Sequence, residues 1–281
     1  MKKINALLLA LVLSLPLWAQ GQVTTRKHRL ADFTDKMTKV VLSGNELLMG
    51  ALRQEVLNTW TSSTFEFCTL EQFEQLKTQD NYYFLIPVES RFKEEEEPGI
   101  VLLTLVKGGP EAAKGIAAMH EVVSLPLGAV AGSNGRDLLY VGGIVQAIQD
   151  YVLSAMESEA VAYQMSDWFN GRFKKSTDDK DVYIAREDVS SAVTEKDMEK
   201  LDEHSFLHLI PVEEVDVIFT SRTPDAVVGY VISPFIPQKG SYCYKLLFEA
   251  DTHRLCYIHK DKIGPKKSEG FLGAELKKLG K

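Results

Sequence analysis

Apolar residues recur along the chain in two patterns, one typical of amphipathic helices and one typical of buried strands. A spacing of four positions, which predicts a helix with one apolar stripe, occurs twice: at Leu48, Leu52, Val56 and Trp60, and again at Ile144, Ile148, Val152 and Met156. Nearly continuous apolar runs, such as 82–89 and 100–106, predict strands that are buried on both faces. The alternation of both patterns indicates an α/β protein.

One apolar motif occurs twice, which suggests an internal duplication. Segment 82–89 (YYFLIPVE) resembles segment 206–213 (FLHLIPVE), and Ile210 follows Ile86 by 124 positions (210 − 86). Two further matches keep the same order, 98–106 with 224–232 and 51–57 with 147–153. The last pair is offset by 96 positions (147 − 51), so the second copy is predicted to carry 28 additional residues (124 − 96), most of them within 158–181.

These patterns predict a fold of class α/β (or α+β) with two tandem, structurally similar units, each built on a mixed sheet. We assign residues 1–21 to a signal peptide, 22–132 to the first repeat and 133–265 to the second, with an insertion near 158–181. Residues 266–281 form a C-terminal tail with a short helix.

The N-terminus has the features of a secretory signal peptide. Two lysines precede an apolar run over 4–17, and small residues follow where a peptidase would cut, near Ala19 or Gly21. That run is shorter than the roughly 20 residues of a membrane-spanning helix, and no later stretch is long enough. The first cysteine is Cys68, so no lipid anchor is expected at the cleavage site. We therefore expect an exported protein, periplasmic or extracellular, that is soluble after cleavage and has no transmembrane segment.

Composition narrows the choice of partner. Hydrophobic residues make up 45% of the chain and charged residues 25%, as in ordinary globular proteins. The net charge of −7 argues against nucleic acid as a partner.

Cys68, Cys243 and Cys256 are too few and too scattered for a disulfide framework, although export would permit one bridge. The strand register expected around 242–260 argues against a bridge between Cys243 and Cys256.

The chain carries no glycine-rich phosphate loop, no nucleophile-elbow motif and no paired CxxC, so we predict neither a cofactor nor a catalytic residue. Glu89 and Glu213 end the two copies of the motif. If a pseudo-twofold axis relates the halves, these carboxylates could meet at the seam between them and hold a proton or a cation. A solvated strand end is the alternative.

Large aromatic residues mark the insertion. Trp168, Phe169 and Phe173 lie within it, in a region with many charged neighbours. They either close the seam between the two halves or form a patch for a ligand or partner.

The signal sequence, the Asp32-Phe33-Thr34-Asp35 start, the helix to Trp60 and the strand-helix-strand order that follows resemble the α/β unit of curli-assembly and TolB N-terminal type envelope domains. This resemblance implies a role in envelope assembly or interaction. We therefore expect a non-enzymatic binding or scaffold protein of a Gram-negative envelope, with an unidentified protein or small molecule as its partner. The alternatives are a hydrolase with carboxylate chemistry, or a small-molecule binder, in the cleft between the repeats.

Overall fold

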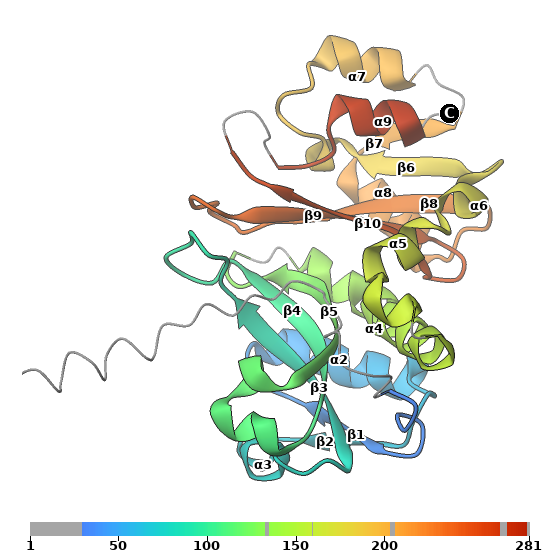
Figure 1. The fold of residues 1–281 in the computed structure, drawn as a ribbon. Helices are drawn as coiled ribbons and strands as arrows, with labels where there is room; N and C mark the ends of the chain where they lie inside the picture. Colours follow the sequence, from blue (N-terminus) through green and yellow to red (C-terminus); the bar gives the residue numbers. More distant parts are fainter. Residues whose placement is uncertain (1–29, 133–134, 159, 203–205, 265–268, 280–281) are drawn as a thin grey trace, which may run out of the picture.

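The computed structural model describes residues 30–132, 135–158, 160–202, 206–264 and 269–279. The predicted signal peptide lies outside these ranges. Within them the chain forms two five-stranded mixed sheets, stacked one above the other (Figure 1).

The two sheets have the same layout. The first contains β1 (Met37–Val41), β2 (Phe65–Cys68), β3 (Tyr82–Ser90), β4 (Ile100–Lys107) and β5 (His120–Ala129), in the order β2-β1-β3-β4-β5. The second contains β6 (Asp181–Ala185), β7 (Leu207–Ile210), β8 (Ala226–Ile232), β9 (Tyr242–Glu249) and β10 (Leu255–Lys262), in the order β7-β6-β8-β9-β10. The first three strands of each sheet are parallel and the last two pairings antiparallel. This arrangement confirms the predicted pair of similar α/β units.

The helices also follow equivalent strands. In the first unit they are α2 (Glu46–Thr59), α3 (Leu70–Leu76), η1 (Pro110–Lys114), η2 (Ile116–Ala118) and α4 (Arg136–Glu157). In the second they are η4 (Arg186–Asp188), α7 (Glu195–Asp202), α8 (Val212–Thr220) and α9 (Gly273–Leu279). By strand order, α2 corresponds to α7, α3 to α8 and α4 to α9. Between α4 and β6 lie η3 (Val161–Tyr163), α5 (Met165–Asn170) and α6 (Phe173–Thr177).

The topology corrects the predicted register of the duplication. Strand β7 is equivalent to β2, so Leu207 corresponds to Phe65, 142 positions earlier (207 − 65). The prediction that segment 206–213 repeats 82–89 is wrong, because in the first copy that motif lies within β3, whereas in the second it ends β7 and begins α8. The two other predicted matches are also wrong, because strand order makes α2 equivalent to α7 rather than α4, and β4, which contains most of 98–106, equivalent to β9 rather than to β8 in 224–232.

The units stack head to tail. Alternate residues of β1 show the two faces of the first sheet: Val40 packs in the core that contains α2 and α4, and Val41 in the core that contains α3. In the second unit the equivalent α7 and α9 cover the outer face, while Phe219 of α8 joins the core on the inner face. The α2 and α4 face of one unit therefore packs against the α8 face of the other, so the seam does not bring identical surfaces together.

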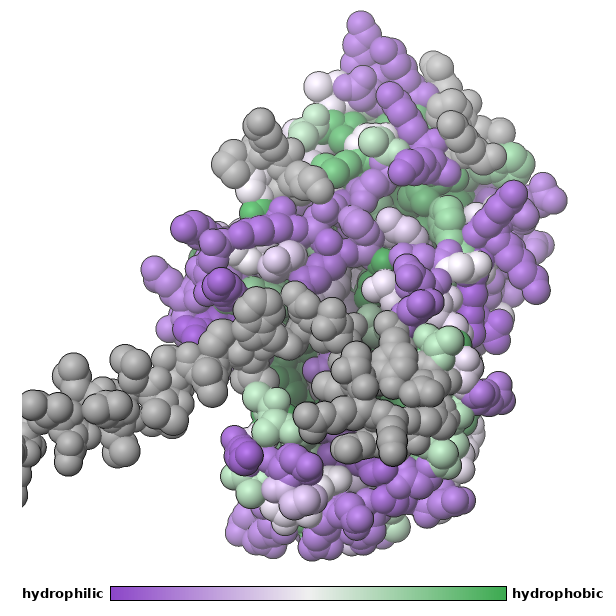
Figure 2. All heavy atoms as spheres, viewed as in Figure 1, coloured by the Kyte–Doolittle hydropathy of each residue, from purple (hydrophilic) through white to green (hydrophobic). Residues whose placement is uncertain are grey.

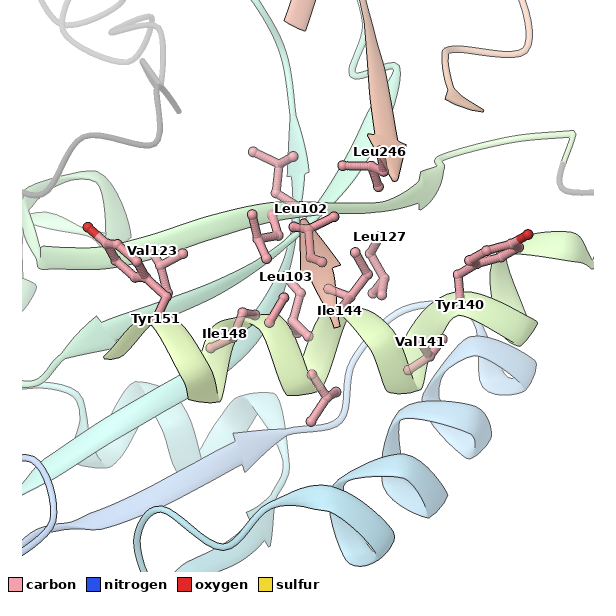
Figure 3. Close-up of a cluster of buried hydrophobic side chains, with 14 of the residues drawn as sticks. Leu102, Leu103, Val123, Leu127, Tyr140, Val141, Ile144, Ile148, Tyr151 and Leu246 are labelled. Atoms are coloured by element: carbon pink, nitrogen blue, oxygen red, sulfur yellow. The ribbon is translucent and has the colours of Figure 1, made fainter. Parts of the chain in front are cut away.

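Helix α4 fills the space between the sheets. Its side chains Ile144 and Ile148 point toward Leu103 and neighbouring residues of the first sheet, and Leu246 of β9 approaches from the second (Figure 3). This double burial explains why α4 is apolar on most sides. Among the described helices, α4 is the one that is long and apolar enough to cross a membrane. This is weak evidence for a membrane span, because the buried core helix of a soluble protein has the same length and composition, and 67% of the most apolar 18-residue window of α4 is buried.

The cysteines confirm the expected absence of a bridge between Cys243 and Cys256. Cys243 pairs across the sheet with Asp261, and Cys256 lies at a bulge opposite Leu247 and Phe248. All three cysteines are buried and free. Their thiols serve as small apolar groups in the core.

Candidate functional site

A crevice opens in the first unit where β1 ends and β3 continues. Strand β1 pairs with β3 only from Tyr82 to Leu85, and β3 runs on to Ser90. The chain leaves β1 toward β2 on one side and later returns to β3 on the other, so the carboxyl end of β1 is a topological switch point, where open α/β sheets usually bind ligands. Pro87 lies in this free stretch of β3, where its missing N–H costs no hydrogen bond to β1.

The crevice has a volume of about 860 Å³, within the range of ligand pockets. Its walls come from the loop before α2 and its first turn, from α3, from the end of β3 and from the segment between β5 and α4. Most of the lining is apolar: Leu47, Leu48, Met49, Leu70, Phe73, Ile86, Pro87, Val88, Val101, Ile116, Ala129, Val130, Ala131 and Leu138.

Two helix caps set the rim of the crevice. The Asn45 side chain accepts hydrogen bonds from the backbone N–H groups of Leu47 and Leu48, at 2.9 and 3.2 Å, and fixes the start of α2. Thr69 forms a capping box that fixes the start of α3. Each cap holds a leucine in the first turn of its helix, Leu47 with 72% and Leu70 with 49% of its surface exposed.

The polar groups of the crevice are mainly acidic. Its ionisable lining consists of Glu74, Lys77, Glu89 and Asp137. Lys77 lies 2.5 Å from Glu74 and is thereby neutralised, whereas Glu89 is exposed at the end of β3. A ligand here would meet an apolar wall with a carboxylate at its edge.

The second unit has a smaller crevice at the equivalent place. It has a volume of about 250 Å³ and lies at the carboxyl ends of β6 and β8, next to Asp188 and Ser233. Both crevices are lined by Ala129, Gly132 and Asp137, so they lie side by side with the start of α4 between them. Gly132 has a φ of +71° and the Phe235 ring lies against it, where a Cβ would clash. The two similar units thus carry adjacent crevices of different character.

An ion-pair network closes the second crevice. Arg136 donates from Nη1 to Asp188 at 2.7 Å and from Nε to Asp216 at 2.8 Å, and the Tyr140 hydroxyl donates to the same Asp216 oxygen at 3.0 Å. Burial lowers the pKa of the Arg136 guanidinium, but Asp188, Tyr140 and Asp216 raise it by more, so this group stays charged. The network fastens α4 to the second unit. The Asp188 and Asp216 carboxylates that take part in it are already bonded to Arg136.

The predicted acids Glu89 and Glu213 occupy different structural positions. Glu89 lines the first crevice. Glu213 lies exposed in the first turn of α8, and its structural equivalent is Glu71. The residue equivalent to Glu89 is Ser233, which directly follows β8. The head-to-tail stacking therefore removes the symmetry on which the predicted pair of carboxylates depended.

The predicted aromatic residues pack inside the chain. Phe169 is fully buried and stacks on Tyr151 of α4, with ring centroids 6.0 Å apart, and half-buried Trp168 meets the same ring edge-on. Phe173 contacts Tyr257 of β10. Helix α5 lies against both α4 and β10 (Figure 1), and Phe169 as placed offers no surface to a partner.

One group of described residues has the composition of a metal site. Ligand atoms of His259, Asp261 and Glu275 lie within 4.8 Å of one another. The fully buried Lys245 ammonium lies 2.7 Å from the Asp261 carboxylate and 2.5 Å from that of Glu275. A bound metal would have to displace this ammonium. We therefore interpret the cluster as an ion-pair network that fixes α9 to the second sheet.

The exposed rim leucines Leu47 and Leu70 were missed in the sequence, although the caps before them are visible there. On the face shown in Figure 2, hydrophilic residues cover much of the coloured surface. Comparison with known protein families, with curated proteins and with solved structures found no match to this chain, and its function must be inferred from the crevice itself.

Proposed function

We propose that this chain is an exported, non-enzymatic binding protein of a Gram-negative envelope, and that it holds a largely apolar ligand in the crevice of the first unit. The observation that carries the proposal is the 860 Å³ apolar crevice at the switch point between β1 and β3. The N-terminal segment typical of a signal peptide supports export.

The lining favours binding over catalysis. An active site needs convergent acids, bases or nucleophiles within hydrogen-bond reach of a substrate. In the crevice, Glu74 is paired with Lys77, and the exposed rim includes the apolar residues Leu47 and Leu70 beside Glu89. Exposed leucines around a hollow are typical of a surface that a ligand or partner covers. Glu89 beside this surface favours a ligand that also carries a positive charge.

The proposal is tested with the mature chain, residues 22–281, titrated with the neutral apolar fluorophore Nile red. We expect saturable binding that weakens about tenfold or more in Leu47→Asp, because this change removes the apolar surface that Leu47 offers to the ligand and adds a charge to the rim of the crevice. Leu57→Asp is the matched control, since Leu57 is 57% exposed on the same helix α2 and does not line the crevice. Equal affinities of the two variants would contradict the proposal.

The hydrolase alternative predicts a different result. Turnover of simple carboxylic esters by the mature chain, lost in Glu89→Gln, would replace the binding proposal with an enzymatic one. We expect no difference between the wild-type chain and this variant.

A further inference from the structure

A second cavity lies at the other end of α4. It has a volume of about 510 Å³. Its walls combine the second half of α4, the segment through α6, the end of β9 and the start of β10, with the lining residues Asp150, Leu153, Ser154, Arg172, Lys175, Ser176, Lys180, Glu249 and Arg254. Asp137 in the first crevice and Asp150 here are 13 residues apart on one helix (150 − 137), a separation of about 20 Å. The two cavities are therefore distinct.

This cavity is basic in a protein that is acidic overall. Two arginines and two lysines line it, against two carboxylates, which leaves an excess of two positive charges, whereas the whole chain has a net charge of −7. The four cations come from separate segments: Arg172 and Lys175 from the region of α6, Lys180 from the residue before β6, and Arg254 from the turn before β10. The fold has brought them together around a hollow.

The cations do not form close ion pairs with the two acids. Arg172 and Arg254 lie 3.8 and 3.5 Å from the Asp150 carboxylate. Lys180 lies 3.6 Å from that of Glu249. The buried pairs at Arg136, in contrast, measure 2.7 and 2.8 Å. These longer separations are at or beyond the limit of a good hydrogen bond, so the basic donors are not consumed by the acids.

One oxygen of each acid accepts a hydrogen bond from a neutral donor, whereas Oδ2 of Asp150, the oxygen that faces Arg172 and Arg254, is buried without a hydrogen-bond partner among the described residues. The Asp150 carboxylate accepts a hydrogen bond from Gln146 at 2.7 Å, and that of Glu249 accepts one from Thr252 at 2.8 Å. The acids thus position the cavity wall, while the guanidinium and ammonium groups remain able to donate to a ligand.

The orientation of the Arg172 guanidinium favours binding of such a ligand. Its guanidinium stacks on the Trp168 ring, 3.6 Å from the ring centroid, which fixes the plane of its N–H groups. Its Nη1 atom is buried and has no hydrogen-bond partner among the described residues. A buried N–H of a charged group without a partner is costly, and an anion in the cavity would supply the missing acceptor.

We propose that this basic cavity binds a phosphate-bearing ligand. A phosphate monoester carries a charge of about −1.5 to −2 at pH 7 and three strong acceptor oxygens, which matches the excess of two positive charges. The volume exceeds that of the phosphate group, and Leu153, 37% exposed, offers an apolar wall for the attached organic group. The phosphate belongs either to a soluble monoester or to a lipid headgroup.

The test measures affinity by calorimetry with glycerol 1-phosphate, and by co-sedimentation with vesicles that contain phosphatidic acid, whose headgroup is a phosphate monoester, compared with vesicles of phosphatidylcholine alone. We expect binding that weakens about tenfold or more in each of Lys175→Gln and Arg254→Gln. Lys175 is exposed and Arg254 is 51% exposed, so both variants should fold. Lys196→Gln, which neutralises an exposed lysine on α7, is the control and should bind normally.

The two probes separate the sources of the phosphate. Binding of glycerol 1-phosphate indicates a soluble ligand, and binding only to vesicles that contain phosphatidic acid, with the same sensitivity to Lys175→Gln and Arg254→Gln, indicates a lipid headgroup. Failure of both probes would overturn the proposal, as would equal affinities of the two variants and the Lys196→Gln control. Neither result bears on Nile red binding in the first crevice.

Discussion

The Asp188 carboxylate lies 2.7 Å from Nη1 of Arg136, and this contact joins the last residue of η4, which directly follows β6 in the second unit, to the first residue of α4. Both side chains are buried, with 10% and 8% of their surfaces exposed. The pair therefore couples the two units at the point where their crevices meet.

Replacing Arg136 with methionine should destabilise the chain by about 3–5 kcal/mol, because it leaves Asp188 and Asp216 buried without their cation. The free energy of unfolding in urea measures this cost. Lys262→Gln, which removes the surface pair with Glu94, should change the stability little and serves as the control. A cost below about 1 kcal/mol for Arg136→Met would show that the network does not fasten the units.

Glu121 should make stability depend on pH. Burial raises the pKa of its carboxyl to about 7 from 4.5, although Ser124 donates a hydrogen bond to it, and its Oε1 atom is buried without a partner among the described residues. The unfolded chain therefore loses this proton at a lower pH than the folded chain does. The folded state is penalised progressively as the pH rises from about 4.5 to 7.

Glu121→Gln should consequently be more stable than the wild-type chain at pH 8, and the difference should shrink as the pH falls to 4.5. Urea unfolding of both proteins at several pH values measures this difference. A gap that stays constant across this range would contradict the raised pKa.

Phe169→Ala should cost about 3–5 kcal/mol, because it leaves a cavity between α4 and α5 in a fully buried site. Phe235→Ala is the comparison, since this ring is 67% exposed and its loss should cost far less. Thermal and urea unfolding distinguish the two. If the two variants lost similar free energies of unfolding, Phe169 would contribute less to the packing between the units than its burial implies.

Apolar patterns in the sequence predicted the class of fold, because burial of alternate or periodic side chains follows from local geometry. The prediction of two similar units was also right, although the segments matched to support it are not equivalent in the structure. The four-residue stripes correctly predicted helices α2 and α4. The caps at Asn45 and Thr69 are also local, since each side chain bonds to backbone N–H groups two or three residues away.

Tertiary structure alone decided which segments are equivalent. The Ile-Pro-Val-Glu motif continues a strand at Pro87, where β4 pairs on one side and β1 has ended on the other. At Pro211 the same motif ends a strand and begins α8. A short apolar motif is compatible with both outcomes, and its neighbours in space choose between them. The predicted pairing of Glu89 with Glu213 depended on that choice.

The crevices, too, depended on tertiary structure. The apolar crevice exists because β1 is shorter than β3, and the basic cavity exists because Arg254 lies next to the segment that holds Arg172 and Lys180, 74 positions earlier in the sequence (254 − 180). By itself the sequence determined two α/β units, their helical stripes and their capped helices, all of which rest on contacts between near neighbours. The head-to-tail stacking, and with it the position of both cavities along α4, was decided by packing between residues far apart in the chain.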